Sequence, residues 1–232
     1  NELSENVLED VSLTIPKGKM TAIVGTSGSG KTTLVKLLLG FYEGQKGAIK
    51  IGNFALSNLN KGDWRAKCGA VMQDGFIFSD TIANNIAESD ETPDRAKLLH
   101  AVKVANIQEF IESLPLSYNT VIGAQGNGVS QGQRQRLLIA RAVYKNPDYL
   151  FFDEATNALD AMNERTIVEN LNTFFEDRTV IVVAHRLSTV KNADQIVVLE
   201  KGKVVEIGTH SKLVENRGKY YQLVKNQLEL GS

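Results

Sequence analysis

Nearly continuous apolar runs recur along this chain and predict its main strands. They cover residues 20–24, 149–152, 180–184 and 195–199. Such runs are typical of parallel strands that helices cover on both faces. Residues 203–207 instead alternate apolar and polar side chains, as an edge strand does. We therefore expect an α/β fold built on a mainly parallel sheet.

Smaller strands are predicted in the N-terminal third of the chain. Residues 7–15 alternate apolar and polar side chains before the turn Pro16-Lys17-Gly18-Lys19, which is typical of a half-exposed antiparallel strand. Residues 48–51 and 69–72 each predict a further short strand. We therefore expect an N-terminal antiparallel β subdomain beside the main sheet.

The middle of the chain, residues 81–144, has helical periodicity and few strand signals. Thr92-Pro93 predicts a helix start, because a cap residue there precedes a proline in the first turn. The apolar stripe of this helix is expected to be Ala96, Leu99, Val102 and Val104 or Ala105. A shorter helix is expected at residues 107–114, and Ser130 predicts the cap of a long helix that Asn146-Pro147 ends.

These patterns predict how the 232 residues are organised. Further amphipathic helices are expected at residues 160–175 and after Gly218. We expect a single domain over residues 1–232, in which residues 1–76 and 146–232 form the core with its antiparallel β part. Residues 77–145 are then an inserted helical subdomain.

Composition narrows the class of protein. The chain is 42% hydrophobic and 23% charged, as in an ordinary globular protein, and its net charge of −1 argues against a nonspecific nucleic-acid binder. No apolar run is long enough to cross a bilayer, and no signal peptide precedes the first strand. The single Cys68 cannot form an intrachain disulfide and fits a reducing cytosol.

A glycine-rich segment, Gly25-Thr26-Ser27-Gly28-Ser29-Gly30-Lys31-Thr32, matches the phosphate-loop pattern G-x-x-x-x-G-K-[ST]. It lies between a predicted strand and a helix expected at residues 32–39, which is the context that the motif requires. Its glycines let backbone N–H groups wrap phosphates, and the helix start adds the positive end of a dipole. Lys31 supplies a point charge to the terminal phosphates and Thr32 a hydroxyl to Mg²⁺. The alternative, a glycine-rich turn that binds nothing, is disfavoured by this context.

Two carboxylates follow the predicted strand at residues 149–152. Asp153 lies at the carboxyl end of that strand, where α/β sheets place ligands, and can hold Mg²⁺ through its water shell. Glu154 can orient and partly deprotonate the water that attacks a γ-phosphate. The alternative is that both acids face solvent in a loop, which is a stronger objection for Glu154 than for Asp153.

Two further strand ends carry polar side chains that are unremarkable alone. His185 follows the strand at residues 180–184 and can hydrogen-bond a γ-phosphate, although a histidine there is more often structural. Gln73 follows the strand at residues 69–72 and can contact the magnesium shell or the attacking water.

A second anion site is predicted at Ser130-Gln131-Gly132-Gln133. Ser130 and the backbone N–H of Gly132 stand at a helix start, which favours phosphate. The chain's own phosphate loop already covers the near side of a nucleotide. We therefore expect the second site to serve the nucleotide of a partner chain.

Taken together, these motifs resemble the ATP-binding domain of ABC transporters over essentially the whole chain. They occur in that family's order and approximate spacing: the phosphate loop, Gln73, Ser130-Gln131-Gly132-Gln133, Phe152-Asp153-Glu154, Ala158-Leu159-Asp160 and His185. The resemblance implies a P-loop NTPase core of the RecA-like class and hydrolysis of MgATP to ADP and phosphate. It implies that Glu154, His185 and Lys31 are catalytic, and that Thr32, Gln73 and Asp153 serve the metal. Nucleotide contacts are implied for Gly25, Thr26, Ser27, Gly28, Ser29, Gly30, Lys31, Thr32, Thr33, Gln73, Ser130, Gly132, Gln133 and Asp160.

The finer pattern resembles the exporters of this family. It consists of Gln73-Asp74, Phe78, Thr81-Ile82, Asn85-Ile86, Asp153-Glu154-Ala155-Thr156, His185-Arg186-Leu187-Ser188-Thr189 and Gly208-Thr209-His210. Similar exporters include peptide and bacteriocin exporters that carry a peptidase domain. The resemblance implies a head-to-tail dimer with a second copy and a transmembrane domain of the same transporter as partners. It implies a place on the cytoplasmic side of the inner membrane, with no nucleic acid bound and no direct membrane insertion.

The chain departs from the family pattern in three places. Gln131 stands where the usual signature has glycine, yet Ser130 and Gly132 remain, so we expect the phosphate contacts to survive. Residues 1–19 contain no Phe, Tyr or Trp, so we expect adenine to stack on a residue upstream or to be held in another way. Ala124 stands where exporters often have an acidic residue facing the membrane domain.

Two other functions remain open at this point. A soluble ABC-type ATPase acting on DNA or ribosomes usually needs long coiled-coil insertions, tandem domains or basic patches, and the sequence has none of these. A regulatory module that binds ATP without turnover is disfavoured by the intact Lys31, Asp153, Glu154 and His185.

Overall fold

The computed structural model describes residues 7–88, 90–123, 126, 128–155, 159, 161–184 and 187–230. The chain divides into two compact units. The first comprises residues 1–68, 149–153 and 177–232, and the second residues 69–148 and 154–176. The expected helical subdomain, residues 77–145, lies wholly within the second unit.

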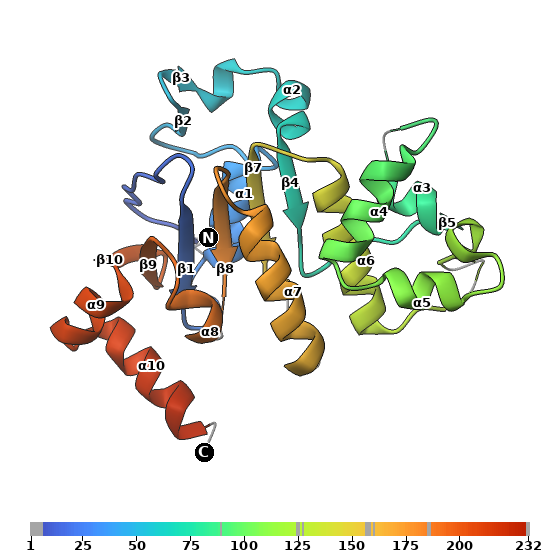
Figure 1. The fold of residues 1–232 in the computed structure, drawn as a ribbon. Coiled ribbons are helices and arrows are strands. Elements are labelled where there is room, and N and C mark those ends of the chain that lie inside the picture. The colour runs from blue at the N-terminus through green and yellow to red at the C-terminus, as the bar shows by residue number, and fades with distance from the viewer. Residues whose placement is uncertain are drawn as a thin grey trace, which may run out of the picture. The chain divides into compact units, whose positions relative to one another are not determined.

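The first unit is organised by a mainly parallel sheet. Its strands are ordered β10-β9-β1-β8-β7, with β1 parallel to β8 and β9, β7 parallel to β8, and β10 antiparallel to β9. In Figure 1 these strands lie side by side. The bounds are β1 Met20–Gly25, β7 Tyr149–Asp153, β8 Thr179–Val183, β9 Gln195–Glu200 and β10 Lys203–Gly208. The predicted central strands and the predicted edge strand are confirmed.

Apolar runs form the central strands because both of their faces are covered. Every residue of β8 is buried, and α1 (Lys31–Leu38) packs against β1, β7 and β8. The expected end of this helix is confirmed, because Gly40 follows it with φ 71°, a conformation that glycine adopts without strain. The unit also contains β2 Lys50–Ile51, β3 Phe54–Ala55, η1 Leu56–Asn58, α2 Lys61–Ala66, α8 Leu187–Val190, α9 His210–Asn216 and α10 Lys219–Leu230.

One predicted strand is wrong. The segment at residues 7–15 has the alternation of a strand but forms none in the structure. Glu9 N–H donates to the carbonyl of Gly202 (2.9 Å), yet no ladder continues from this bond in the described residues. Asp10 has φ 50°, a left-handed conformation that interrupts an extended strand. The other N-terminal antiparallel pairing is the short pair β2–β3, which covers only part of the predicted residues 48–51.

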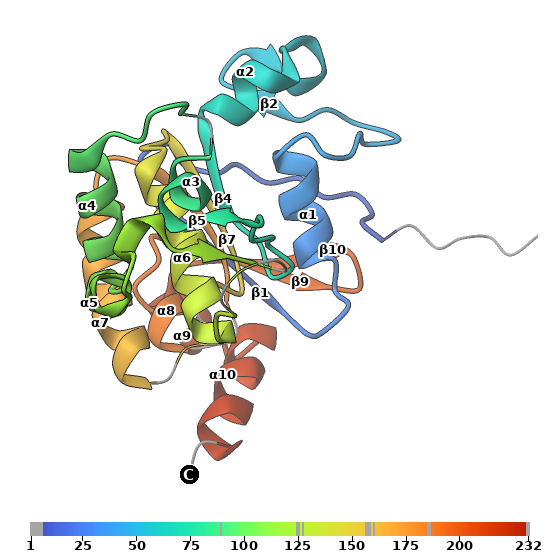
Figure 2. The same ribbon diagram turned by 90° about the vertical axis from the view of Figure 1, so that its right-hand side faces the viewer.

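The second unit is mainly helical, and α6 is its central helix. Helices α3 and α4 both pack against α6, and α4 also packs against α7. Figure 2 shows α4, α6 and α7 close together in this unit. Its elements are β5 Asp80–Thr81, α3 Ile82–Ala87, α4 Arg95–Val104, α5 Gln108–Ser113, η2 Ser117–Asn119, β6 Val121–Ile122, α6 Gln131–Tyr144 and α7 Ala161–Phe174. The strand β4 (Cys68–Val71) leads from the first unit into this one.

The start of α4 is two residues later than its sequence signal. Asp94, rather than Thr92, caps the helix, because the Asp94 side chain accepts a hydrogen bond from Lys97 N–H (2.9 Å). The predicted apolar stripe is correspondingly wrong in its first turns: Ala96 is exposed, whereas Leu98 is buried. Among the residues that the structure places, no helix is both long and apolar enough to cross a membrane.

Candidate nucleotide-binding site

The predicted phosphate loop connects the end of β1 to the start of α1. The backbone of Gly28, at its apex, has φ 75°, and a Cβ added there would meet nothing within 4 Å. A Cβ on Gly25 would instead lie 2.1 Å from the carbonyl oxygen of Leu199 in β9. Gly25 is therefore required by packing against the neighbouring strand, whereas Gly28 keeps an open surface on the loop.

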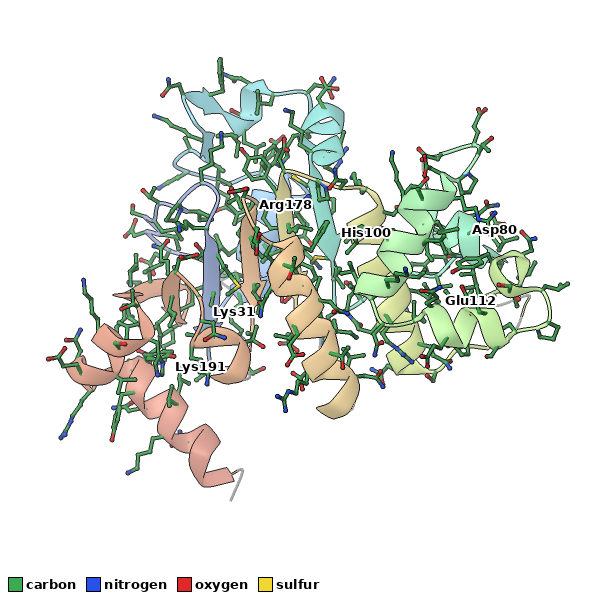
Figure 3. All side chains as sticks on the ribbon, in the orientation of Figure 1. Lys31, Asp80, His100, Glu112, Arg178 and Lys191 are labelled. Atoms are coloured by element: carbon green, nitrogen blue, oxygen red, sulfur yellow. The ribbon has the colours of Figure 1, made fainter. Side chains whose placement is uncertain are left out.

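Lys31 is the first residue of α1 and is only 6% exposed. Its ammonium group donates to the carbonyl oxygens of Gly25 (2.9 Å) and Thr26 (2.8 Å). The charge is thus held inside the curve of the loop by the loop's own backbone. Figure 3 labels Lys31 near the ends of the parallel strands in the first unit.

Asp153 ends β7 at the same edge of the sheet as the phosphate loop. Along the parallel register, Ile23 of β1 is level with Val183 of β8, and Val183 is level with Asp153. Because neighbouring strands are about 4.8 Å apart, Asp153 lies about 10 Å across the sheet from β1. Its side chain is fully buried, with a relative exposure of 0%. The sheet therefore brings a buried carboxylate and the loop to one edge, as predicted.

The residues of this edge fit a magnesium–triphosphate ligand. The open surface at Gly28 leaves room for phosphate oxygens, and the hydroxyl of Ser29 is buried without a hydrogen-bond partner in the described part of the chain. Asp153 and Thr32, which is half-buried, offer the oxygen ligands that Mg²⁺ prefers. A helix N-terminus adds backbone N–H donors and a positive dipole end for an anion.

Glu154 follows Asp153 in an unusual backbone conformation. Its φ is 53°, in the left-handed region, which costs a residue with a Cβ about 1–2 kcal/mol. Such strain is commonly retained at functional sites. Glu154 belongs to the second unit and is half-buried. The strained backbone agrees with a role for Glu154 that differs from that of Asp153.

Ser130 caps α6 as predicted, and its surroundings refine the prediction for Gln133. The hydroxyl of Ser130 accepts from Gln133 N–H (3.2 Å), and the Gln133 side chain accepts from Ser130 N–H (2.8 Å). This capping box commits the Gln133 side chain to the helix start. In the described part of the chain no hydrogen bond engages the N–H groups of Gln131 and Gly132. An exposed helix start thus keeps donors for an anion.

Of the remaining residues singled out in the sequence, the structure describes some and not others. Gln73 is exposed in the turn after β4. His185 and Asp160, together with Ala124, lie outside the described residues. The two histidines without an assigned function have structural contacts: the His100 ring is 6.3 Å from that of Phe174, and His210 Nδ1 hydrogen-bonds the hydroxyl of Tyr220 (2.8 Å).

Sequence reasoning missed a cluster of polar side chains in the second unit. Asn85, at 1% exposure, accepts from Phe78 N–H (2.8 Å) and donates to the carbonyls of Phe78, Asp80 and Thr81. Arg134 and Arg141 of α6 donate to backbone carbonyls of the same stretch. The spacing of these arginines in the sequence is the same as that of arginines that face solvent. Their contacts with backbone carbonyls are therefore seen only in the structure.

Comparison with known proteins identifies the family to which this geometry belongs. A family model described as "ABC transporter" matches residues 8–157, from before the phosphate loop to just beyond Glu154. The chain belongs to the ABC transporter family. This confirms the resemblance seen in the motifs. The chain is an ATP-binding domain of the type found in ABC exporters.

Relatives of this ABC domain include proteins named for toxin translocation. Exotoxin translocation ATP-binding protein PaxB of Pasteurella aerogenes is 47% identical over 96% of this chain and 31% of that protein. Toxin RTX-III translocation ATP-binding protein of Actinobacillus pleuropneumoniae is 46% identical over 96% of this chain and 31% of that protein. ABC transporter B family member 28 of Arabidopsis thaliana is 45% identical over 95% of this chain and 31% of that protein. The chain therefore spans about a third of the length of these relatives.

A solved structure supports the fold at the level of the whole domain. It is titled "Structure of a bacterial Atm1-family ABC exporter with ATP bound". It matches 95% of this chain and 39% of its own chain, with a TM-score of 0.91 and 40% sequence identity. The predicted α/β class, with a mostly parallel core and additional antiparallel strands, is confirmed.

Proposed function

We propose that this chain is the ATP-hydrolysing motor domain of an ABC exporter. The observation that carries the proposal is the phosphate loop with the buried Lys31 at one edge of the sheet, where β7 also ends in Asp153. The relatives named as translocation ATP-binding proteins support the coupling of hydrolysis to export. Because these names specify the translocation of toxins, and the motifs resemble those of peptide exporters, we propose a secreted toxin or peptide as the exported molecule.

The proposed reaction is ATP + H₂O → ADP + phosphate. Backbone N–H groups of residues 26–33 and the Lys31 ammonium bind the phosphate oxygens and offset the charge that develops on transfer. Glu154 orients the attacking water and accepts its proton while the bond from the γ-phosphorus to the bridging oxygen breaks. The resemblance adds His185 as a γ-phosphate contact and Gln73 as a contact of the water or metal shell.

Magnesium is proposed as the metal of this reaction. Thr32 and Asp153 would hold it, Thr32 directly and Asp153 through the water shell, and the resemblance to the family adds Gln73 as a further residue that serves the metal. When bound, the ion would supply positive charge that offsets the charge of the triphosphate. The buried carboxylate of Asp153 and the open loop surface support this assignment.

A second copy of the chain is the proposed partner at the nucleotide. The exposed start of α6 keeps donors at Gln131 and Gly132 beside the Ser130 hydroxyl, which favours an anion there. We assign this anion to the triphosphate held by the partner's phosphate loop, in a head-to-tail dimer. Asp160 is proposed to lie at the same interface.

A transmembrane domain of the same transporter is the proposed second partner. The second unit exposes two aromatic side chains just after Gln73: Phe76 is 63% exposed and Phe78 is 43% exposed, with ring centroids 5.3 Å apart. Exposed paired aromatics are typical of a protein interaction surface. Their place beside a proposed nucleotide contact suits a partner that senses the nucleotide, on the cytoplasmic side of the inner membrane.

The reaction is tested by Glu154→Gln, which removes the proposed base but keeps the shape of the side chain. We expect ATP turnover to fall by about 10²–10⁴-fold, because that is the usual contribution of a positioned general base. ATP affinity, measured by calorimetry, should stay within about twofold, since the phosphate loop is intact. The matched control is Glu109→Gln, an exposed glutamate of α5. Equal turnover of the two variants would contradict the assignment.

A further inference from the structure

Gln73 belongs to a tight turn that is packed closely on α6. Gly75 N–H donates to the carbonyl of Met72 (3.1 Å), which closes a four-residue turn with Gln73 at its second position. A Cβ on Gly75 would lie 2.5 Å from Cδ1 of Leu138, a residue of α6. The end of the turn therefore lies directly against the helix, and a Cβ at Gly75 would require either the Leu138 side chain or the turn to shift.

An arginine of α6 holds the same turn. Both Nε and Nη2 of Arg134 donate to the carbonyl oxygen of Gly75, the Nε bond being 3.1 Å long. A hydrogen bond from a charged donor is stronger than one between neutral groups. The carbonyl that ends the Gln73 turn is thus fixed to the first turn of α6.

A second arginine extends the attachment two helical turns further along α6. Arg141 donates to the carbonyls of Phe76 (2.9 Å) and Asn85 (2.7 Å), and its guanidinium lies 5.3 Å from the centre of the Phe78 ring. Asn85 in turn binds both backbone groups of Phe78. The consecutive carbonyls of Gly75 and Phe76 are therefore each held by α6.

The helix that holds this turn is also the helix that begins at Ser130. Arg134 lies four residues after Ser130, and Arg134 N–H donates to the Ser130 carbonyl (2.8 Å). One rigid helix thus joins the proposed contact for the partner's nucleotide to the turn that carries Gln73. All of these contacts lie within the second unit.

We propose that Arg134 is a positioning residue that fixes Gln73 to the Ser130 end of α6. Through Arg134, displacement of the helix start on binding the partner's nucleotide moves the Gln73 turn with it. This inference rests on the proposed function, because it requires Gln73 to act in ATP turnover. It adds a residue whose effect on turnover passes through Gln73 and not through direct contact with ATP.

The test is a double-mutant cycle between Arg134→Ala and Gln73→Ala in the full-length protein that contains this chain, with ATP turnover as the readout. We expect Arg134→Ala to lower kcat by about 10–100-fold, as a small misplacement of a catalytic group does, with KM for ATP within about twofold. In the Gln73→Ala background, Arg134→Ala should cause no further loss beyond about twofold. If the fold-loss of kcat in the double variant equalled the product of the two single fold-losses, the proposal would be overturned.

Two further variants keep the test decisive if Arg134→Ala weakens folding. Arg134→Lys keeps one charged donor and should recover part of the lost kcat. Gly75→Ala leaves the arginine in place and crowds the turn against Leu138, so we expect it to lower kcat in the same direction as Arg134→Ala and to cause no further loss in the Gln73→Ala background. No recovery of kcat in Arg134→Lys, or a kcat loss in Gly75→Ala that persists in the Gln73→Ala background, would count against the proposal.

A matched control separates this effect from loss of any arginine. Arg165 of α7 is 83% exposed and pairs only with Glu169 on its own helix among the described contacts. Arg165→Ala should leave kcat within about twofold, since exposed pairs of this kind contribute little. A wild-type protein without ATPase activity would overturn the proposed function and this inference together. An active wild type with independent losses would overturn the inference alone.

Discussion

The same added methyl group should weaken mainly ATP binding at one glycine of the phosphate loop and mainly folding stability at another. In Gly28→Ala, the new Cβ meets no atom within 4 Å, so the main cost to folding is the left-handed φ of 75°. That cost is about 1–2 kcal/mol, which lowers Tm by roughly 2–8 °C in a chain of this size. The methyl group would stand on the open surface where we propose that phosphate binds. ATP affinity should therefore fall by about tenfold or more, the equivalent of one lost charge-assisted hydrogen bond.

Gly25→Ala should instead damage the fold. Its Cβ would lie 2.1 Å from the Leu199 carbonyl oxygen, a backbone atom that cannot turn away as a side chain can. Forced overpacking of this kind costs about 1–3 kcal/mol or more in the free energy of unfolding. Urea unfolding and calorimetric ATP titration of both variants provide the measurements. If Gly28→Ala bound ATP as tightly as the wild type, or if Gly25→Ala were the more stable variant, the steric reasoning would be refuted.

Three further predictions follow from single side chains. Lys31→Ala should weaken ATP binding by about tenfold or more and reduce turnover, because a charged donor to phosphate is lost; an unchanged affinity by calorimetry would refute this. Asn85→Ala should lower the free energy of unfolding in urea by about 2–4 kcal/mol, because Asn85 is itself buried and its loss leaves the backbone groups of Phe78, Asp80 and Thr81 without this partner; a loss below about 0.5 kcal/mol would count against it. Burial raises the pKa of Tyr220 to about 12. Because an unfolded tyrosine ionises near pH 10, stability should fall between about pH 10 and 12, and urea unfolding of Tyr220→Phe should show a smaller fall.

The sequence predicts the central sheet well because its strands are buried on both faces. The runs at β7, β8 and β9 contain almost no polar positions and are only five or six residues long. Short apolar runs of this kind, rich in β-branched and aromatic residues, favour a buried strand over a helix. Residues 7–15 show the limit of this reasoning. Alternation indicates an extended segment with one exposed face, but a strand also needs a neighbour to pair with along its length, and pairing depends on distant residues. The left-handed Asp10 interrupts the segment.

The α4 helix shows a second limit, because competing caps lie close together. Thr92 and Asp94 are both good cap residues, and the choice between them is decided by which side chain reaches the helix N–H groups. Tyr144 contributes to that choice, since its hydroxyl accepts from Asp94 N–H (2.9 Å) and donates to Asp90 (2.5 Å). These contacts join residues about fifty positions apart, so local pattern cannot anticipate them.

The candidate site was predictable to the extent that its chemistry is local. The phosphate loop, Asp153 at a strand end and Ser130 at a helix start each follow from a few neighbouring residues. The contact made by Arg134 was not predictable, because the carbonyl to which it donates lies fifty-nine residues away in the chain. Gln133 shows the converse, since the structure gives its side chain a capping partner that competes with the predicted ligand contact.

The central proposal is that two copies of this domain close on shared ATP. Its most direct measurement is the molar mass of Glu154→Gln by light scattering, with and without MgATP, in this chain and in its full-length protein. We expect ATP to double the mass of the chain, and Ser130→Arg in the same background to abolish the doubling by blocking the start of α6 while leaving ATP binding within about twofold. A Glu154→Gln protein that binds ATP tightly yet stays monomeric at high concentration, alone and beside its membrane domain, would contradict the account.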